Sequence, residues 1–186
     1  MLNTDMGFRT HAVLTLTKQN DLKNQLGVLA EKIRQLPGVE GATLQGHASM
    51  GDAMLQQPVA CSCKKGEQEM VSIQAGTADF IPFYGMKMLA GRNILPSDSL
   101  RELVINETYS RNLGFINLQD ALGALLVLNE RAYPVVGVVA DFHDGPLSRA
   151  TGSVLIGHIP DFESSISSAF TIKAALANPV KSLRAI

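Results

Sequence analysis

Two aspartates and a histidine follow a valine-rich run of the sequence, in the stretch Asp141-Phe142-His143-Asp144. On an extended strand Asp141 and His143 would share a face, so their side chains could supply two metal ligands. Protein zinc sites use three or four ligands, so this pair alone is too small for a tight site. The other histidines lie in separate segments and nothing requires them to converge: His11, His47 and His158.

Three interpretations of this stretch remain open. The first is a metal-dependent hydrolase that uses Asp141, His143 and Asp144. The second is a loop that contacts a partner. The third is the end of a buried strand, where polar side chains meet water and Asp144-Gly145-Pro146 turns the chain. The sequence favours the third, because Val135 to Val139 is apolar on both faces, as expected for a central strand.

Cys61 and Cys63 form a C-x-C pair. On a strand their side chains would share a face with Cα atoms about 7 Å apart, at or beyond the usual limit for a disulfide. A zinc site of about four ligands would need further cysteines, and the sequence has only these two. The spacing favours two small side chains on a strand.

The elements around these residues begin with a β-α-β unit. Residues 11–18 alternate in polarity and predict a strand, and Val39 to Gln45 predicts a second strand. Between them, apolar residues recur at helical spacing up to the Pro37-Gly38 stop. These residues are Leu22, Leu26, Leu29, Ile33 and Leu36.

The middle of the chain is richer in strands. Residues 59–64 and 69–75 predict one hairpin, and residues 124–128 and 133–142 predict another across residues 129–131. Further strands are predicted at residues 86–89, 102–105 and 153–159, with short helices near residues 77–80, 107–113 and 117–121. Asn106 is expected to cap the helix that starts at Glu107, and Gly114 to end it.

The end of the chain repeats the strand-then-helix order of its beginning. Residues 167–175 predict a strand, and Asn178-Pro179 is a typical helix start. Because only about two helical turns follow, we expect the natural protein to continue beyond Ile186. The predicted fold is α+β, with one β-α-β lobe formed by residues 1–50 and 151–186 and an inserted, mainly β lobe at residues 51–150.

Composition excludes some classes of function. The chain has 186 residues and a net charge of -1, which argues against binding nucleic acid by phosphate neutralisation. It has no tryptophan, so a stacking platform for bases or sugars is not expected. No apolar run reaches the roughly 20 residues of a membrane span, and no G-x-x-x-x-G-K-[ST] motif for nucleotide phosphates occurs.

An ordered set of short motifs resembles one known family. In chain order these are Leu36-Pro-Gly-Val39, Asp79-Phe80, Gly91-Arg92, Leu103-Val-Ile-Asn-Glu107, Leu113-Gly114, Gly123, Val136-Gly-Val-Val139 and Asp141-Phe142. Together they resemble the MacB-like periplasmic core domain of ABC transporter permeases, the group that includes the MacB, FtsX and lipoprotein-releasing permeases. Asp5-Met-Gly-Phe8 is similar to the segment after the first membrane helix in such permeases from Bacteroidetes.

The resemblance implies a porter-like lobe with a second lobe inserted in it, in a domain that continues past Ile186. It implies an extracytoplasmic, periplasmic domain of an inner-membrane protein that is not an enzyme and holds no cofactor or metal. Such a domain would couple ATP-driven movement of membrane helices to substrate or partner proteins. Its implied partners are the parent permease's own helices, a cytoplasmic ATPase subunit and an adaptor or outer-membrane protein. A free-standing binding module is the remaining alternative.

The motif residues have simple structural interpretations. Gly91, Gly114 and Gly123 are dispersed, so they predict chain turns and positive φ rather than a phosphate-binding loop. Arg92 could pair with a carboxylate or stay solvated. The residues that we expect to be structural members of the family motifs are Gly91, Arg92, Asn106, Glu107, Gly114, Gly123, Gly137, Asp141 and Phe142.

Overall fold

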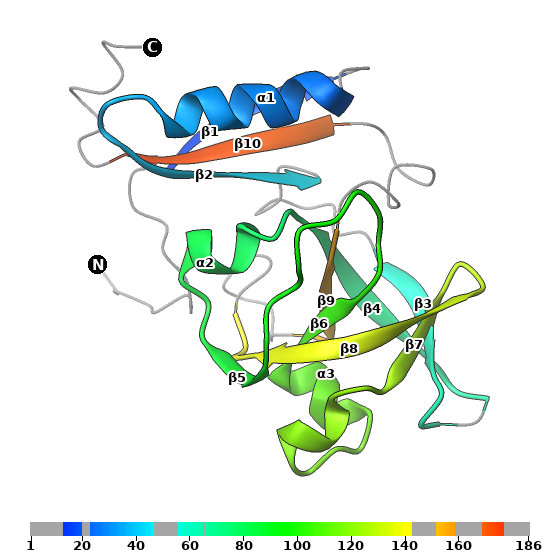
Figure 1. Ribbon diagram of the computed structural model, residues 1–186. Coiled ribbons are helices and arrows are strands. Elements are labelled where there is room, and N and C mark those ends of the chain that lie inside the picture. The colour runs from blue at the N-terminus through cyan, green and yellow to red at the C-terminus, as the bar shows by residue number, and fades with distance from the viewer. Residues whose placement is uncertain are drawn as a thin grey trace, which may run out of the picture.

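The computed structural model describes residues 13–19, 23–46, 56–64, 66–142, 152–158 and 169–176. The predicted helix after Asn178 and the side chains of His143 and Asp144 lie outside these ranges. Within them the chain forms two β-sheets and a few short helices (Figure 1). No helix in this described part is both long enough and apolar enough to cross a membrane.

The smaller sheet confirms the predicted β-α-β opening. β1 (Val13–Gln19) leads into α1 (Lys23–Arg34), which is followed by β2 (Val39–Gly46). β10 (Ala169–Leu176) lies between β1 and β2 and pairs antiparallel with both. The helix α1 covers one face of this sheet, and the opposite face is turned toward α2 (Phe80–Tyr84) and the larger sheet (Figure 1).

The apolar face of α1 differs by one position from the predicted one. Ala30 and Ile33 are buried, whereas Leu29 is 42% exposed. Among the α1 side chains that the structure describes, Ala30 therefore takes the buried place predicted for Leu29, and the helix ends at Arg34, just before the predicted stop, where Gly38 adopts a φ of 84°.

The larger sheet has seven strands in the order β5-β8-β6-β9-β4-β3-β7, and β7 also pairs with β8. This last pairing joins two distant parts of the sheet, so the sheet curls back on itself around a buried interior. The strands are β3 (Gln56–Cys61), β4 (Gln68–Ala75), β5 (Met88–Gly91), β6 (Leu103–Asn106), β7 (Leu125–Leu128), β8 (Arg131–Val139) and β9 (Val154–Gly157).

β8 is a central strand, as its valines predicted. Its second half lies between β5 and β6, and Val138 and Val139 are fully buried. The hairpin from β7 turns through two residues, Asn129 and Glu130, with φ values of 48° and 65°. Arg131 pairs with Leu128, so the loop is one residue shorter than the sequence indicated.

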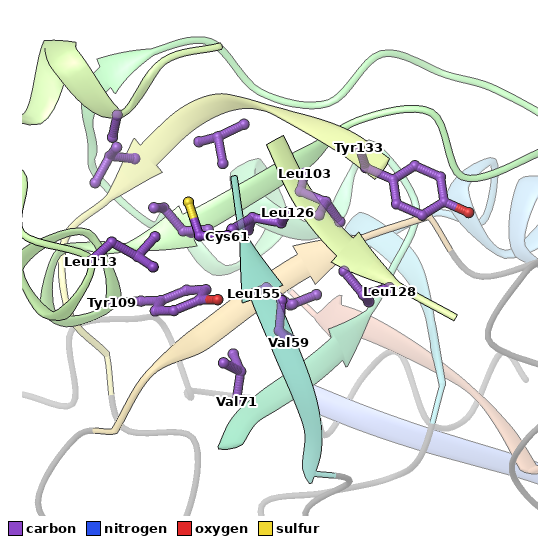
Figure 2. Close-up of a cluster of buried hydrophobic side chains, with 14 of the residues drawn as sticks. Val59, Cys61, Val71, Leu103, Tyr109, Leu113, Leu126, Leu128, Tyr133 and Leu155 are labelled. Atoms are coloured by element: carbon purple, nitrogen blue, oxygen red, sulfur yellow. The ribbon is translucent and has the colours of Figure 1, made fainter. Parts of the chain in front are cut away.

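Alternating side chains place two clusters on the two faces of the central strands. Leu103 and Ile105 of β6 pack into the interior of the curled sheet, and Val104 packs on its outer face. The helix α3 (Glu107–Asn112) adds Tyr109 to the interior cluster, which Figure 2 shows. The helix α2 (Phe80–Tyr84) covers the outer cluster, and a 3-10 helix, η1 (Leu118–Ala121), leads into β7.

β9 belongs to the larger sheet, where it pairs parallel with β4 and antiparallel with β6. The sequence had grouped residues 151–186 with the β-α-β unit. All four residues of β9 are buried, because Leu155 packs in the interior cluster and Val154 and Ile156 pack in the outer cluster, while β4 and β6 pair with its two edges. Among the described strands of residues 151–186, β10 is the one that pairs in the smaller sheet.

Candidate functional site

Asp141 lies just after β8 and binds the start of α3. Its Oδ1 accepts hydrogen bonds from the Asn106 side-chain amide at 2.7 Å and from the Thr108 backbone N–H at 2.9 Å. Its Oδ2 accepts from the Thr108 hydroxyl at 2.7 Å. A carboxylate at the first turn of a helix also meets the positive end of the helix dipole. Asp141 therefore joins the end of one strand to the start of the next helix.

Asn106 is the hub of this network and is fully buried. Its Oδ1 accepts from the backbone N–H of Tyr109 at 3.2 Å, which confirms the predicted helix cap. The same oxygen accepts from Val154 N–H at 2.9 Å, and the amide also donates to the Gly152 carbonyl at 2.9 Å. The cap thus holds the start of β9 as well as α3.

This arrangement determines what Asp141 can do chemically. Both of its oxygens are already engaged, three times in all, by donors of the protein itself. Among the residues that the structure describes, no cluster of three or more histidine, cysteine, aspartate or glutamate side chains could hold a metal ion. The geometry around Asp141 is that of a carboxylate that organises a helix terminus.

Gly91 and Gly137 allow β5 and β8 to approach each other closely. A Cβ on Gly91 would collide with the Val136 carbonyl oxygen, and one on Gly137 would collide with the Arg92 carbonyl oxygen. Gly91 also has a φ of 66°, as Gly114 and Gly123 have positive φ values of 95° and 84°. The predicted positive φ at these three glycines is confirmed, and at Gly91 close packing adds a second requirement for glycine.

Arg92 pairs with Glu102, a partner that sequence reasoning did not find. Two parallel hydrogen bonds of 2.7 Å join the guanidinium to the carboxylate. The carboxylate also accepts the Leu95 backbone N–H at 2.7 Å, so it fixes the loop between β5 and β6. These hydrogen bonds from Arg92 hold the pKa of Glu102 below its usual value, against a smaller opposing effect of burial, and that of Arg92 is raised in turn.

The other motif residues have local roles. Glu107, in the first turn of α3, forms an ion pair with Arg111 one turn later at 2.5 Å. Gly114 follows α3, and its N–H bonds to the Arg111 carbonyl at 2.9 Å. Phe142 is buried in the cluster under α2. The structure brings Asn106 and Asp141 together, and it places Arg92 with Gly91 and Gly137 at the β5–β8 contact.

The prediction for Cys61 and Cys63 was wrong, because the two residues form a disulfide. β3 ends at Cys61 and the chain turns at once, with the Lys64 N–H bonded to the Cys61 carbonyl at 3.1 Å. The turn brings the two Cα atoms to 5.1 Å, well inside the limit that an extended strand would exceed. The sequence placed the turn at Lys65-Gly66, whereas the described chain already turns at Ser62, directly after β3.

Several polar contacts join the smaller sheet to the region around α2, and we call this set the junction. Arg34, at the end of α1, bonds to Asp79 at 2.5 Å, and Thr43 of β2 bonds to Thr77 at 3.3 Å. The Tyr84 hydroxyl donates to the Gln45 side-chain oxygen at 2.7 Å, in a buried contact. The backbone contributes a bond of 3.1 Å from Thr77 N–H to the Leu44 carbonyl.

The junction is well suited to hold its geometry. Burial raises the pKa of Tyr84, so its phenol stays protonated and keeps donating to Gln45. Gly76, next to the junction, bridges to Gln45, and a Cβ at that glycine would clash with the Phe80 ring. Sequence reasoning quoted Asp79 in a motif but did not predict any of these contacts, because the two sides of the junction come from distant segments that only the fold brings together.

Comparison with known proteins decides the family. The family model for the MacB-like periplasmic core domain matches residues 7–184, which is nearly the whole chain. The chain belongs to this family. A search among curated proteins found no match.

Solved structures share the fold of this periplasmic core domain. The periplasmic region of MacB from Actinobacillus actinomycetemcomitans is similar with a TM-score of 0.64 at 14% identity, over 99% of this chain and 84% of that one. A domain of a putative permease from Porphyromonas gingivalis is similar with a TM-score of 0.57 at 18% identity, over 80% of this chain and 66% of that one. The extracellular domain of the ABC-type transporter YknZ from Gram-positive bacteria is similar with a TM-score of 0.58 at 12% identity, over 91% of this chain and 88% of that one.

The family establishes the coarse role and location of the MacB-like core domain described here. It is an extracytoplasmic, periplasmic domain of an ABC transporter permease of the inner membrane. Its fold is α+β and rich in strands, as the sequence predicted. The permeases of this family have membrane helices and work with ATPase partners.

Proposed function

We propose that this domain is a non-catalytic transmitter of movement. ATP binding and hydrolysis on a cytoplasmic ATPase subunit would move the membrane helices of the parent permease, and the domain would carry that movement to a substrate, an adaptor or an outer-membrane protein. The observation that carries the proposal is the family match over residues 7–184.

We propose further that the two sheets are two lobes. The first contains β1, α1, β2 and β10, and the second contains β3 to β9 with α2 and α3. The support is that each sheet has its own hydrogen-bonded strands and that the junction between them is polar and bridged by named side chains. A transmitter needs such a connection, since movement reaches the second lobe through it.

The proposal includes that the domain catalyses no reaction. It is supported by the engagement of Asp141 with Asn106 and Thr108, which directs the strand-end carboxylate to α3. The metal-dependent alternative would use Asp141, His143 and Asp144, and of these three residues the structure describes Asp141. The motif residues Gly91, Arg92, Asn106, Glu107, Gly114, Gly123, Gly137, Asp141 and Phe142 would then serve the shape of the second lobe.

The test is a distance measurement in the parent permease reconstituted in lipid nanodiscs with its ATPase. One spin label is placed at Ile116→Cys, which is fully exposed, and another on a membrane helix, after all native cysteines of the permease, Cys61 and Cys63 included, are replaced by serine. We expect the distance distribution to shift between the nucleotide-free and ATP-bound states. A distribution that stays the same in every nucleotide state would contradict the proposal.

A further inference from the structure

The two sulfurs of the Cys61–Cys63 disulfide lie in different surroundings. Cys61 is 5% exposed and packs among the interior side chains of the curled sheet, near Tyr109 and Leu126 (Figure 2). Cys63 is exposed, in the turn that follows β3. A thiolate from solution can therefore reach one end of the bond and is kept from the other, which makes attack selective.

The turn has contacts that do not depend on the disulfide. The Ser62 N–H bonds to the Leu125 carbonyl at 2.9 Å, and the Ser62 hydroxyl accepts the Leu125 N–H at 3.3 Å. The Lys64 ammonium bonds to the Asn112 carbonyl at 2.7 Å. These bonds tie the turn to β7 and α3, so the turn keeps its place when the disulfide opens.

The disulfide also closes a very small ring, since its cysteines are two positions apart in sequence. Cross-links stabilise folded proteins mainly by restricting the unfolded chain, and the effect grows with the length of the closed loop. A disulfide that closes so short a loop contributes little to the stability of the fold. A domain of this length buries enough apolar surface to be stable without disulfides. We therefore look for the role of this disulfide in its reactivity toward thiols.

We propose that Cys61–Cys63 is a reversible thiol–disulfide exchange site that takes dithiols of the extracytoplasmic space as reductants. The thiolate of the dithiol attacks Sγ of Cys63, the S–S bond breaks, and its electron pair leaves with Sγ of Cys61. The Cys63 N–H already donates to this sulfur at 3.1 Å, which stabilises the departing thiolate.

The second half of the exchange completes the balance. The remaining thiol of the dithiol attacks its own sulfur in the mixed disulfide and releases Cys63. The protein gains two electrons and two protons and becomes a dithiol, and the reductant becomes a disulfide. Exchange in the opposite direction restores the bond. This inference goes beyond the proposed function and does not rest on it.

The first experiment uses the purified oxidised domain and dithiothreitol as the probe. We expect alkylation and intact-mass analysis to count two new thiols per chain while the near-ultraviolet circular dichroism stays that of the folded protein. The melting temperature of the reduced domain should fall by about 5 °C or less, as a short closed loop predicts. Reduction that occurs only together with unfolding would overturn the proposal.

A matched pair of variants locates the attacked sulfur. Cys61→Ser leaves the exposed thiol, and Cys63→Ser leaves the buried one. In the folded proteins, the first should form a mixed disulfide with oxidised glutathione about tenfold faster or more than the second, and the rates should become similar in denaturant. Equal rates in the folded proteins would remove the asymmetry on which the site depends.

Discussion

At the scale of single residues, the side chain of Asn106 uses its whole hydrogen-bonding capacity. It donates to Asp141 and Gly152 and accepts from Tyr109 and Val154 while fully buried. An ordinary helix cap contributes about 1 kcal/mol, and each buried backbone group left without a partner costs roughly 1–3 kcal/mol more. This residue therefore does much more than a cap on the surface.

We expect Asn106→Ala to lower the free energy of unfolding by about 2–4 kcal/mol, measured by urea denaturation. The matched control is Asn117→Ala, which removes the exposed cap of η1, whose oxygen accepts the Gln119 N–H at 3.3 Å. The control should cost about 1 kcal/mol or less. Equal losses in the two variants would show that the wider network of Asn106 contributes nothing.

Asp141 distinguishes the structural interpretation from the metal interpretation. We expect Asp141→Asn to lower the free energy of unfolding by about 1–2 kcal/mol, because an amide cannot accept from all three donors that the carboxylate binds. Thermal melts of the native domain should be the same with and without added zinc. A zinc-induced rise in melting temperature that disappears in Asp141→Asn would favour the metal site instead.

The sequence predicted part of this network. Asn106 was identified as a cap from its place before a helical segment, and Asp141 as a polar strand end. Thr108 was missed, because nothing local links it to a carboxylate 33 positions away. The partner of Arg92 was missed for the same reason, since many carboxylates could pair with an arginine and only the loop geometry selects Glu102.

At the scale of elements, the Arg92–Glu102 pair holds the loop between β5 and β6. The pKa of Glu102 is lowered in the folded state, so its carboxylate stabilises the fold fully at pH values above its unfolded pKa. That contribution is lost as the pH falls below about 4.5 and through the lower folded value. The pair should therefore contribute to acid sensitivity.

We expect Glu102→Gln to lower the free energy of unfolding by about 1 kcal/mol at pH 7 and by less at pH 3, because pH 3 lies below the unfolded pKa of a glutamate and part of the stabilisation by the native carboxylate is already lost there. Urea denaturation across this pH range measures it, with Glu107→Gln as the control for an ion pair within one helix. A loss that is the same at both pH values would contradict the role of ionisation.

The contact of β5 with β8 depends on two glycines. Gly137→Ala should lower the free energy of unfolding by about 3 kcal/mol or more, since its Cβ would meet backbone atoms that cannot move aside cheaply. Gly27→Ala in α1 is the control, because a Cβ there meets nothing within 4 Å and alanine favours helix by about 1 kcal/mol. Chemical denaturation measures the free energy of unfolding of both variants. An unchanged value for Gly137→Ala would contradict the prediction.

Element types could largely be read from the sequence, and pairings less so. The strand and helix periodicities predicted β1, α1, β2, β6, α3 and β8 close to their observed bounds. The position of β9 in the larger sheet could not be read, since a short apolar strand carries no record of its neighbours. The turn after Cys61 was missed because extended spacing was assumed to continue through Cys63.

At the scale of the whole molecule, we propose that the junction makes the two proposed lobes move together. It combines an ion pair at Arg34, a buried tyrosine–glutamine bond and a threonine pair, all between elements distant in the sequence. A transmitter that connects membrane helices with outer partners requires lobes that keep their relative position. We therefore expect movement of the parent permease to displace the two lobes as one unit.

Movement of the two proposed lobes as one unit is tested by the distance between spin labels at Val28→Cys and Ile116→Cys in the parent permease, in the cysteine-free background. Val28 is 57% exposed on the first lobe, and Ile116 is fully exposed on the second. We predict the same narrow distance distribution with and without ATP, broadened when Arg34→Ala and Tyr84→Phe weaken the junction. A distribution that is broad in the intact junction, or that shifts with nucleotide, would contradict the claim that the lobes transmit movement as one unit.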